Sequence, residues 1–395
     1  MDYKNHTGRI ILWIIAIICL IIFALVLLDG FFVKEKTTTV VENVPEINDV
    51  KNEVKIEKEI VKEEKVIEAE TVFAKNLNIP WDFTFLPNEE MLVTERVGNL
   101  VHIGKDGNKK VIPLPHPVPK GEGGLLGIVL HPNFSINNFL YLYMTTQNTK
   151  DGTKNTVYRY KYENGKLLDE KIIIKNIPGA IYHDGGRMEF GPDGLLYITT
   201  GDAQTPAIAQ DLKSLGGKIL RLTDEGEIPK DNPFDSAVYS YGHRNPQGLA
   251  WDSEGRLWST EHGRSGVVTG MDEVNLIVKG GNYGWPDIEG DKTKEGMKTP
   301  ALHSGSTVTW APASLLYLDG KLFFGGLKGE SLYEAVLENG KVKELKSHFK
   351  NEYGRIRTVR VGPDGMIYFS TSNRDGRGKV IAEDDKIVRV DPKSL

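Results

Sequence analysis

One short pattern recurs six times along this chain and constrains its fold more than any other feature. Each copy is a turn of the Pro-Asp-Gly type, or a close relative of it, followed by a run of β-forming residues. The copies begin at Pro87, Pro132, Pro192, Asp252, Leu318 and Pro363. Such a turn joins antiparallel strands, and four strands need about 40–50 residues, which is the size of one propeller blade.

The repeat predicts an all-β fold, a six-bladed β-propeller, over residues 71–395. The 42 glycines against 19 prolines are typical of many short strands joined by tight turns. No long helical periodicity interrupts this region. Two stacked β-sheets are the alternative architecture, but they would not give six evenly distributed copies of one turn.

The N-terminal segment has a different character. Ile10 to Leu28 are 19 consecutive apolar residues, which is about what a helix needs to cross a bilayer. Lys4 and Arg9 precede this run, so the cation bias places the N-terminus in the cytoplasm. We therefore expect residues 1–30 to hold a cytoplasmic N-terminus and a retained transmembrane helix. A cleaved signal peptide is the alternative, although no small-residue cleavage site follows the run.

A charged linker is predicted over residues 31–70. From Lys51 to Glu70, 12 of 20 residues are Lys, Glu or Asp, which favours a solvated helix or a disordered tether. The sequence thus predicts a single-pass protein of the cell membrane that holds its propeller outside the cytoplasm.

Charge and motifs exclude several function classes. The net charge is −5, and residues 34–70, with 7 Lys and 11 acidic residues, contribute −4 of it, so no basic face for nucleic acid is expected. The single cysteine excludes a disulfide framework and a CxxC zinc site. The run Gly121-Glu122-Gly123-Gly124 lacks the Lys-Ser/Thr of a phosphate loop, and no EF-hand or HExxH motif is present.

One loop carries a candidate general base. His183 lies in Tyr182-His183-Asp184-Gly185-Gly186-Arg187, before the strand that leads to Pro192. Asp202 ends the following strand, so pairing of the two strands would return its carboxylate to the histidine and fix the tautomer that a base needs. A plain turn histidine is the alternative interpretation.

Other loops are unusually rich in cations. Arg244, Lys328, Arg355 and Arg357 come from three predicted blades, and the last two point to the same face if they lie in a strand. These cations could converge on a polyanionic ligand. Scattered surface ion pairs are the alternative.

Several longer motifs occur in a recognisable order. They are Gly123-Gly124-Leu125-Leu126-Gly127, His183 with Gly186-Arg187, Gly216-Lys218-Leu220-Arg221 with Gly226-Ile228-Pro229, Gly242-His243-Arg244-Asn245-Pro246-Gln247-Gly248-Leu249, Asp272-Glu273-Val274-Asn275 and Gly280-Gly281-Asn282-Tyr283-Gly284-Trp285-Pro286. With them, the chain from about Thr71 to Asp391 resembles the soluble quinoprotein glucose/sorbosone dehydrogenases, also called aldose sugar dehydrogenases. The fold of that family is a six-bladed propeller.

The resemblance implies an activity and a set of site residues. The family oxidises the anomeric hydroxyl of an aldose to a lactone with pyrroloquinoline quinone (PQQ) and Ca²⁺, and a quinone or a small redox protein would accept the electrons. By resemblance His183 is the base and Asp202 orients it, and the main-chain carbonyls of Gly263 and Arg264 match the calcium site. The positions that match cofactor-binding residues are Glu122, Arg244, Asn245, Thr309, Lys328, Arg355 and Arg357.

The sequence departs from the family pattern at two places, and two other functions compete. Glu122 stands where glucose-specific members have Gln, and the loop from Gly263 to Asp272 is longer, with Arg264 in place of a proline. A calcium-dependent propeller lactonase would need clustered carboxylates instead of cations. A non-catalytic binding module would not need His183 and Asp202 together with the cations.

Overall fold

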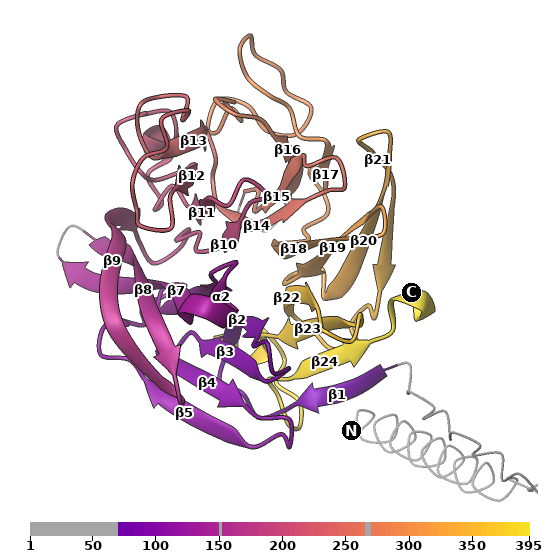
Figure 1. Cartoon of the computed structure of the whole chain (residues 1–395). Helices are drawn as coiled ribbons and strands as arrows, with labels where there is room; N and C mark the ends of the chain where they lie inside the picture. Colours follow the sequence, from indigo (N-terminus) through magenta and orange to yellow (C-terminus); the bar gives the residue numbers. More distant parts are fainter. Residues whose placement is uncertain (1–69, 150–151, 265–269) are drawn as a thin grey trace, which may run out of the picture. The chain divides into compact units, whose positions relative to one another are not determined.

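The computed structural model describes residues 70–149, 152–264 and 270–395. Every described residue belongs to one compact unit, which spans Val66–Leu395. In that unit, six four-stranded antiparallel sheets follow one another around a ring (Figure 1). The predicted six-bladed β-propeller is confirmed.

Each blade is built from consecutive strands, except at the point where the ring closes. Blade 1 consists of β2 (Pro80–Phe85), β3 (Met91–Glu95), β4 (Asn99–Ile103) and β5 (Lys109–Pro113). Blade 2 consists of β6 (Leu125–Leu130), β7 (Phe139–Thr149), β8 (Gly152–Glu163) and β9 (Lys166–Gly179). Blade 3 consists of β10 (Met188–Phe190), β11 (Leu196–Thr200), β12 (Lys218–Leu222) and β13 (Val238–Tyr241). Blade 4 consists of β14 (Pro246–Trp251), β15 (Leu257–Glu261), β16 (Glu273–Ile277) and β17 (Leu302–His303). Blade 5 consists of β18 (Pro312–Leu318), β19 (Lys321–Gly326), β20 (Ser331–Glu338) and β21 (Lys341–His348).

Blade 6 combines both ends of the propeller. Its strands are β22 (Ile356–Val361), β23 (Ile367–Thr371), β24 (Ile387–Val390) and, as the outermost strand, β1 (Glu70–Ala74). Glu70 pairs with Val390 in antiparallel register. The N-terminal strand therefore closes the ring, and β1 and β24 lie side by side in Figure 1.

The six repeated turns all occupy the same place in the architecture. Each one joins the first strand of a blade to the second, as Pro87 does between β2 and β3 and Pro192 between β10 and β11. Second strands such as β11 and β15 are buried along their whole length because neighbouring blades cover both faces of the sheet. This burial on both faces explains why a run of apolar residues follows each turn in the sequence.

The innermost strands β2, β6, β10, β14, β18 and β22 contact one another in ring order and surround the central channel. Charged side chains cross this channel. Arg187 Nη1 lies 2.6 Å from Asp82 Oδ2, and Arg360 Nη2 lies 3.2 Å from the same oxygen. Burial alone would raise the pKa of Asp82, but the two guanidinium groups hold it below its ordinary value.

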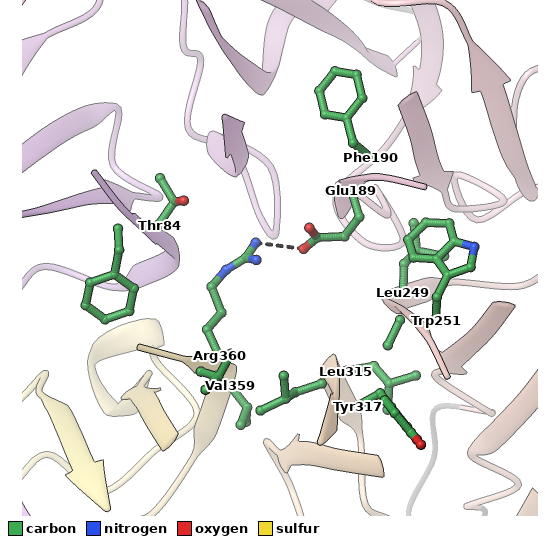
Figure 2. A pocket seen from close by; sticks show the side chains of 13 residues that line it. Thr84, Glu189, Phe190, Leu249, Trp251, Leu315, Tyr317, Val359 and Arg360 are labelled. Atoms are coloured by element: carbon green, nitrogen blue, oxygen red, sulfur yellow. Dashed lines mark ion pairs between the residues drawn. The ribbon is translucent and has the colours of Figure 1, made fainter. Parts of the chain in front are cut away.

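One end of the channel opens into a cavity of about 400 Å³ at the C-terminal ends of the innermost strands. Figure 2 shows Arg360 and Glu189 pointing toward each other there, at 2.8 Å, with Trp251 and Tyr317 on the surrounding wall. None of the candidate site residues lines this cavity. The N-terminal ends of the same strands form the other end of the channel, where the candidate site lies.

Among the described residues, no helix is long and apolar enough to span a membrane. The helices there are α2 (Phe134–Asn137), η1 (Pro206–Ala209), η2 (Asn373–Asp375) and η3 (Pro392–Ser394). The expected transmembrane helix over Ile10–Leu28 and the charged linker up to residue 69 lie outside the described residues.

Candidate active site

A cavity of about 560 Å³ opens at the N-terminal ends of the innermost strands. It is lined by Glu122, Tyr182, His183, His262, Ala311, Leu327, Lys328, Arg355 and Arg377. These residues come from loops of several blades, so the closed ring is what brings them to one mouth of the channel. Four of the residues singled out from the sequence are among them: Glu122, His183, Lys328 and Arg355.

His183 and Asp202 form a hydrogen-bonded pair beside this cavity. Nδ1 of His183 lies 2.7 Å from Oδ1 of Asp202, because β10 and β11 pair and return the chain to the histidine loop. A carboxylate can only accept, so Nδ1 carries a hydrogen, and the neutral imidazole then has its lone pair on Nε2. The aspartate is fully buried, whereas the histidine side chain is 13% exposed.

Two further donors hold the aspartate. The indole Nε1 of Trp285 donates to Oδ2 at 2.8 Å, and the main-chain N–H of Gln204 donates to Oδ1 at 2.9 Å. Three donors from three chain segments thus fix one carboxylate. The orientation of the imidazole follows from this arrangement.

The backbone of His183 is in the left-handed region, with φ of +68°. A residue with a Cβ adopts this conformation at a cost, and it persists only where the surroundings enforce it. The carbonyl of His183 packs so tightly on Gly201 that a Cβ there would lie 1.9 Å from the carbonyl oxygen. On the other side, the N–H of His183 donates to Oε2 of Glu122 at 3.1 Å.

Glu122 is bound on both carboxylate oxygens. Its second oxygen, Oε1, accepts from Arg377 Nη1 at 2.7 Å, and the guanidinium lies 5.3 Å from the ring centre of Tyr182. Burial alone would raise the pKa of Glu122, but Arg377, His262 and these hydrogen bonds lower it to about 2. Glu122 is therefore ionised at any physiological pH.

Arginines crowd the inner end of the cavity. Arg355 pairs with Asp375 at 2.7 Å and also donates to the carbonyl of Leu327. Arg357 is buried behind it, and its contacts with Ser372 and Gln247 are long, at 3.4 and 3.3 Å. Burial, together with the charges of Arg355 and Arg96, lowers the pKa of Arg357 to about 9. This cluster is short of negative charge, so an anion would stabilise it.

Arg244 and Asn245 lie just before β14 and are also buried. Arg244 lies over Trp285, 5.4 Å from its ring centre, and donates to the carbonyl of His262 at 3.3 Å. Asn245 accepts from the N–H of Gly185 at 3.0 Å, whereas its Nδ2 is buried without a hydrogen-bond partner. An unpartnered buried donor costs free energy unless a ligand acceptor meets it.

The remaining predicted cofactor contacts differ in exposure. Lys328 is exposed and lines the cavity, as a cation that meets a ligand should. Thr309 is half-buried, next to Trp310, and is not among the lining residues.

Gly263 and Arg264, the predicted calcium ligands, follow β15. The N–H of Gly263 donates to Oδ1 of Asp272 at 2.9 Å, and the Arg264 side chain pairs with Glu289. Across the described ranges, no three His, Cys, Asp or Glu side chains form a group that could hold a metal ion. A calcium ion here would depend on main-chain oxygens, as predicted, and part of the lengthened loop, residues 265–269, lies outside the described residues.

The described side chains beside Gly263 do not add a cation site. A small cavity there is lined by Glu261, Glu273 and Glu289, but Arg264 lines it too and pairs with Glu289. Burial and the charge of Glu261 raise the pKa of Glu273, which favours its neutral form.

Three functional candidates were not singled out from the sequence: Trp285, His262 and Arg377. His262 is half-buried, and desolvation together with the charges of Arg244 and Arg357 lowers its pKa to about 3, while its Nε2 has no hydrogen-bond partner. Trp285 lay in a quoted motif without an assigned role, and His262 directly precedes the predicted calcium ligand Gly263. For Arg377, the signal was the run Asn373-Arg374-Asp375-Gly376-Arg377, which is as rich in glycine and charge as the other site loops.

Fold and site together define a class of β-propeller enzyme in which a histidine–aspartate pair faces a cationic cavity at one mouth of the channel. The family model for glucose/sorbosone dehydrogenase matches residues 77–382. The chain belongs to this family, and the resemblance inferred from the motifs is confirmed.

Individual relatives agree with this assignment. The chain is 34% identical over 339 residues to an aldose sugar dehydrogenase of Escherichia coli (strain K12), covering 77% of this chain and 90% of that protein. It superposes on a putative glucose dehydrogenase from Thermus thermophilus with a TM-score of 0.77 and 41% identity, covering 81% and 98% of the two chains. The PQQ-bound form of an aldose sugar dehydrogenase from Streptomyces coelicolor gives a TM-score of 0.75 and 38% identity, over 81% and 96%.

Proposed function

We propose that this protein oxidises the anomeric hydroxyl of an aldose to a lactone with bound PQQ. The observation that carries this proposal is the His183–Asp202 pair, at 2.7 Å, beside a cavity whose arginines lack enough counter-charge. The names of the relatives, one of them PQQ-bound, support the same reaction. The cationic cavity does not suit a calcium-dependent lactonase, and the tightly held base has no evident use in a binding module.

The residues present fit PQQ, which carries three carboxylates and an ortho-quinone. Arg355, Arg357 and Lys328 would pair with its carboxylates through charge-assisted hydrogen bonds. The unpartnered Nδ2 of Asn245 and the guanidinium of Arg244 would supply further donors. When bound, the quinone supplies the two-electron acceptor that no side chain of this protein can provide.

His183 would remove the proton of the substrate. Its Nε2 takes the O–H proton of the anomeric hydroxyl while the C–H hydrogen leaves the anomeric carbon as hydride. Positive charge therefore does not build up on the product carbonyl. Asp202 keeps Nδ1 protonated and stabilises the imidazolium that results. Trp285 and Gln204 hold the carboxylate in place during this proton transfer.

We further propose that calcium binds at the carbonyls of Gly263 and Arg264, and that the protein is anchored in the cell membrane with its propeller outside the cytoplasm. Membership of the glucose/sorbosone dehydrogenase family over residues 77–382 supports the first point. The apolar run Ile10–Leu28 with its preceding cations supports the second. Electrons would then pass to a quinone or a small redox protein.

Reconstitution tests this function. The full-length protein in detergent is loaded with PQQ, with and without Ca²⁺, and mixed with a panel of aldoses while quinone absorbance is recorded. Reduction by at least one aldose, with the matching lactone as product, is expected. If PQQ binds and no aldose reduces it, the proposed reaction is wrong.

Membrane fractionation and intact-mass measurement of the native protein test the anchor. The mature chain should still contain the segment that begins at Met1, and it should sediment with membranes. A mature N-terminus near residue 30 would contradict the anchor.

A further inference from the structure

Arg377 lies outside every motif that identified the family, yet it reaches the loop of the proposed base. It follows the short η2 helix in blade 6, and its Nη1 binds Oε1 of Glu122 at 2.7 Å. Glu122 belongs to the connection between blades 1 and 2. The ion pair therefore joins two loops that are 255 residues apart in the sequence, across the mouth of the cavity.

The other oxygen of Glu122 binds the main chain of the base itself. Oε2 accepts from the N–H of His183 at 3.1 Å. A main-chain hydrogen bond also joins the Glu122 loop to the His183 loop, because the N–H of Glu122 donates to the carbonyl of Ile181 at 2.8 Å. At Gly121, with φ of +62°, a Cβ would lie 2.2 Å from that same carbonyl oxygen, so only glycine permits this approach.

The contact matters because His183 holds an unfavourable backbone conformation, φ +68°. Its side chain is fixed by Asp202 and its carbonyl by Gly201, which leaves its N–H as the third point of attachment. An ionised acceptor makes the stronger hydrogen bond to this N–H. Arg377 keeps that acceptor ionised and turned toward the histidine.

We propose that Arg377 is a positioning residue that acts through Glu122 to hold the main chain of His183 in its reactive conformation. In this proposal Glu122 holds the main chain of His183 and does not bind the cofactor. The proposal rests on the proposed function for its kinetic readout, but its structural readout needs neither cofactor nor substrate.

The charged surroundings of Glu122 give the proposal a specific pH signature. Burial tends to raise the pKa of Glu122 above its ordinary 4.5, and Arg377 is the largest of the causes that lower it, to about 2. Without Arg377, the carboxyl should therefore protonate in mildly acidic solution and weaken its bond to His183. Glu122 contacts His183 and Arg377, and it interacts electrostatically with Arg96, Asp184, Arg244, His262 and Arg357.

The first measurement is hydrogen exchange of the apoprotein at the amide of His183, by mass spectrometry of overlapping peptides. Arg377→Met should speed this exchange by about tenfold or more, as expected when a hydrogen bond to a charged group is lost. Lys379→Met is the matched control, an exposed cation two residues further along the same loop. Unchanged exchange at His183 in Arg377→Met overturns the proposal, whatever the protein oxidises.

The second measurement is the pH profile of quinone reduction by sugar in the PQQ-loaded protein. Arg377→Met should lower the maximal rate by about tenfold with little change in KM, because a misplaced base slows only the chemical step. It should also lose rate in acid through one more titrating group than the wild type. The double variant Glu122→Gln/Arg377→Met, which cannot titrate at residue 122, should lose that additional titration.

If the additional titration persisted in the double variant, it would belong to another group and the proposal would be overturned. Rescue of both exchange and rate by Arg377→Lys, which keeps the charge, is expected. Wild-type protein that binds PQQ but oxidises no sugar would refute the proposed function alone, because the exchange measurement on the apoprotein still decides the role of Arg377.

Discussion

The indole Nε1 of Trp285 donates to Oδ2 of Asp202 at 2.8 Å, and the other carboxylate oxygen, Oδ1, accepts a hydrogen bond from Nδ1 of His183. The tryptophan thus sets the plane of the aspartate, and the aspartate sets the plane of the imidazole. Trp285→Phe should keep the packing and lose this donor. Quinone reduction should slow by about tenfold, consistent with one lost hydrogen bond to a charged group. Trp251→Phe, at the opposite mouth of the channel (Figure 2), should match the wild type in the same stopped-flow measurement.

His183→Gln tests the base directly. The glutamine retains a polar side chain but takes no proton near pH 7, so quinone reduction by sugar should fall by at least about a hundredfold. PQQ affinity should change little. Asp202→Asn should slow the reaction by a smaller factor, since the base remains but its orientation is lost. Equal reduction rates in His183→Gln and wild type would contradict the mechanism even with the fold intact.

Arg357→Met and Lys328→Met test the cationic cavity. Each variant should weaken PQQ binding by about 1.5–3 kcal/mol, the contribution of one hydrogen bond to a charged group. Titration of apoprotein with PQQ, followed by fluorescence quenching, measures this loss. Arg357→Met should also be no less stable than wild type without cofactor, because burial already lowers the pKa of this guanidinium to about 9. Unchanged affinity in both variants would show that the cations do not bind the quinone.

Asp184 should make stability pH-dependent. Burial raises its pKa from 3.8 to about 7, although the side chain of Asn155 partly opposes this. Between these values the folded state holds a proton that the unfolded chain has lost, so the free energy of unfolding falls as the pH rises from about 4 to 7. Asp184→Asn cannot ionise, so its melting temperature relative to wild type should rise over this window and level off above it. A pH-independent difference would contradict the raised pKa.

Arg187→Met should destabilise the channel. The substitution leaves Asp82 buried with Arg360 as its remaining cationic partner, and losing one member of a buried ion pair typically costs about 3–5 kcal/mol. Denaturant unfolding measures this loss. Lys343→Met, which breaks an exposed ion pair with Glu338, should leave the midpoint unchanged.

The blades were predictable from the sequence because each repeated turn is a local signal. A turn such as Pro192-Asp193-Gly194 and the strands beside it are encoded within about a dozen residues, and six copies specify six sheets. The His183–Asp202 pair was predictable for the same reason, since its partners flank adjacent strands. The contacts of Trp285 and Arg377 were not, because they join residues 83 and 255 positions apart that only the closed ring brings together.

Local composition also failed to separate two histidines. His183 and His243 both lie in glycine-containing loops that precede the first strand of a blade. His243 is fully buried between Ser240 at 2.8 Å and Glu261 at 2.9 Å, which satisfies both ring nitrogens. His183 has only one nitrogen so occupied and lines the cavity. Three-dimensional neighbours, rather than sequence context, distinguish a structural histidine from a reactive one.

The pairing of Glu70 with Val390 has a consequence for how this protein folds. Five blades can form as the chain emerges, but the sixth waits for its last residues to meet a strand made at the start. Until then, β24 and β1 each present an unpaired edge, and such an edge can recruit a strand from another molecule. A deletion of a few residues at either end of the propeller should therefore convert the closed ring into an aggregating or strand-exchanged form, while the active-site loops stay chemically intact.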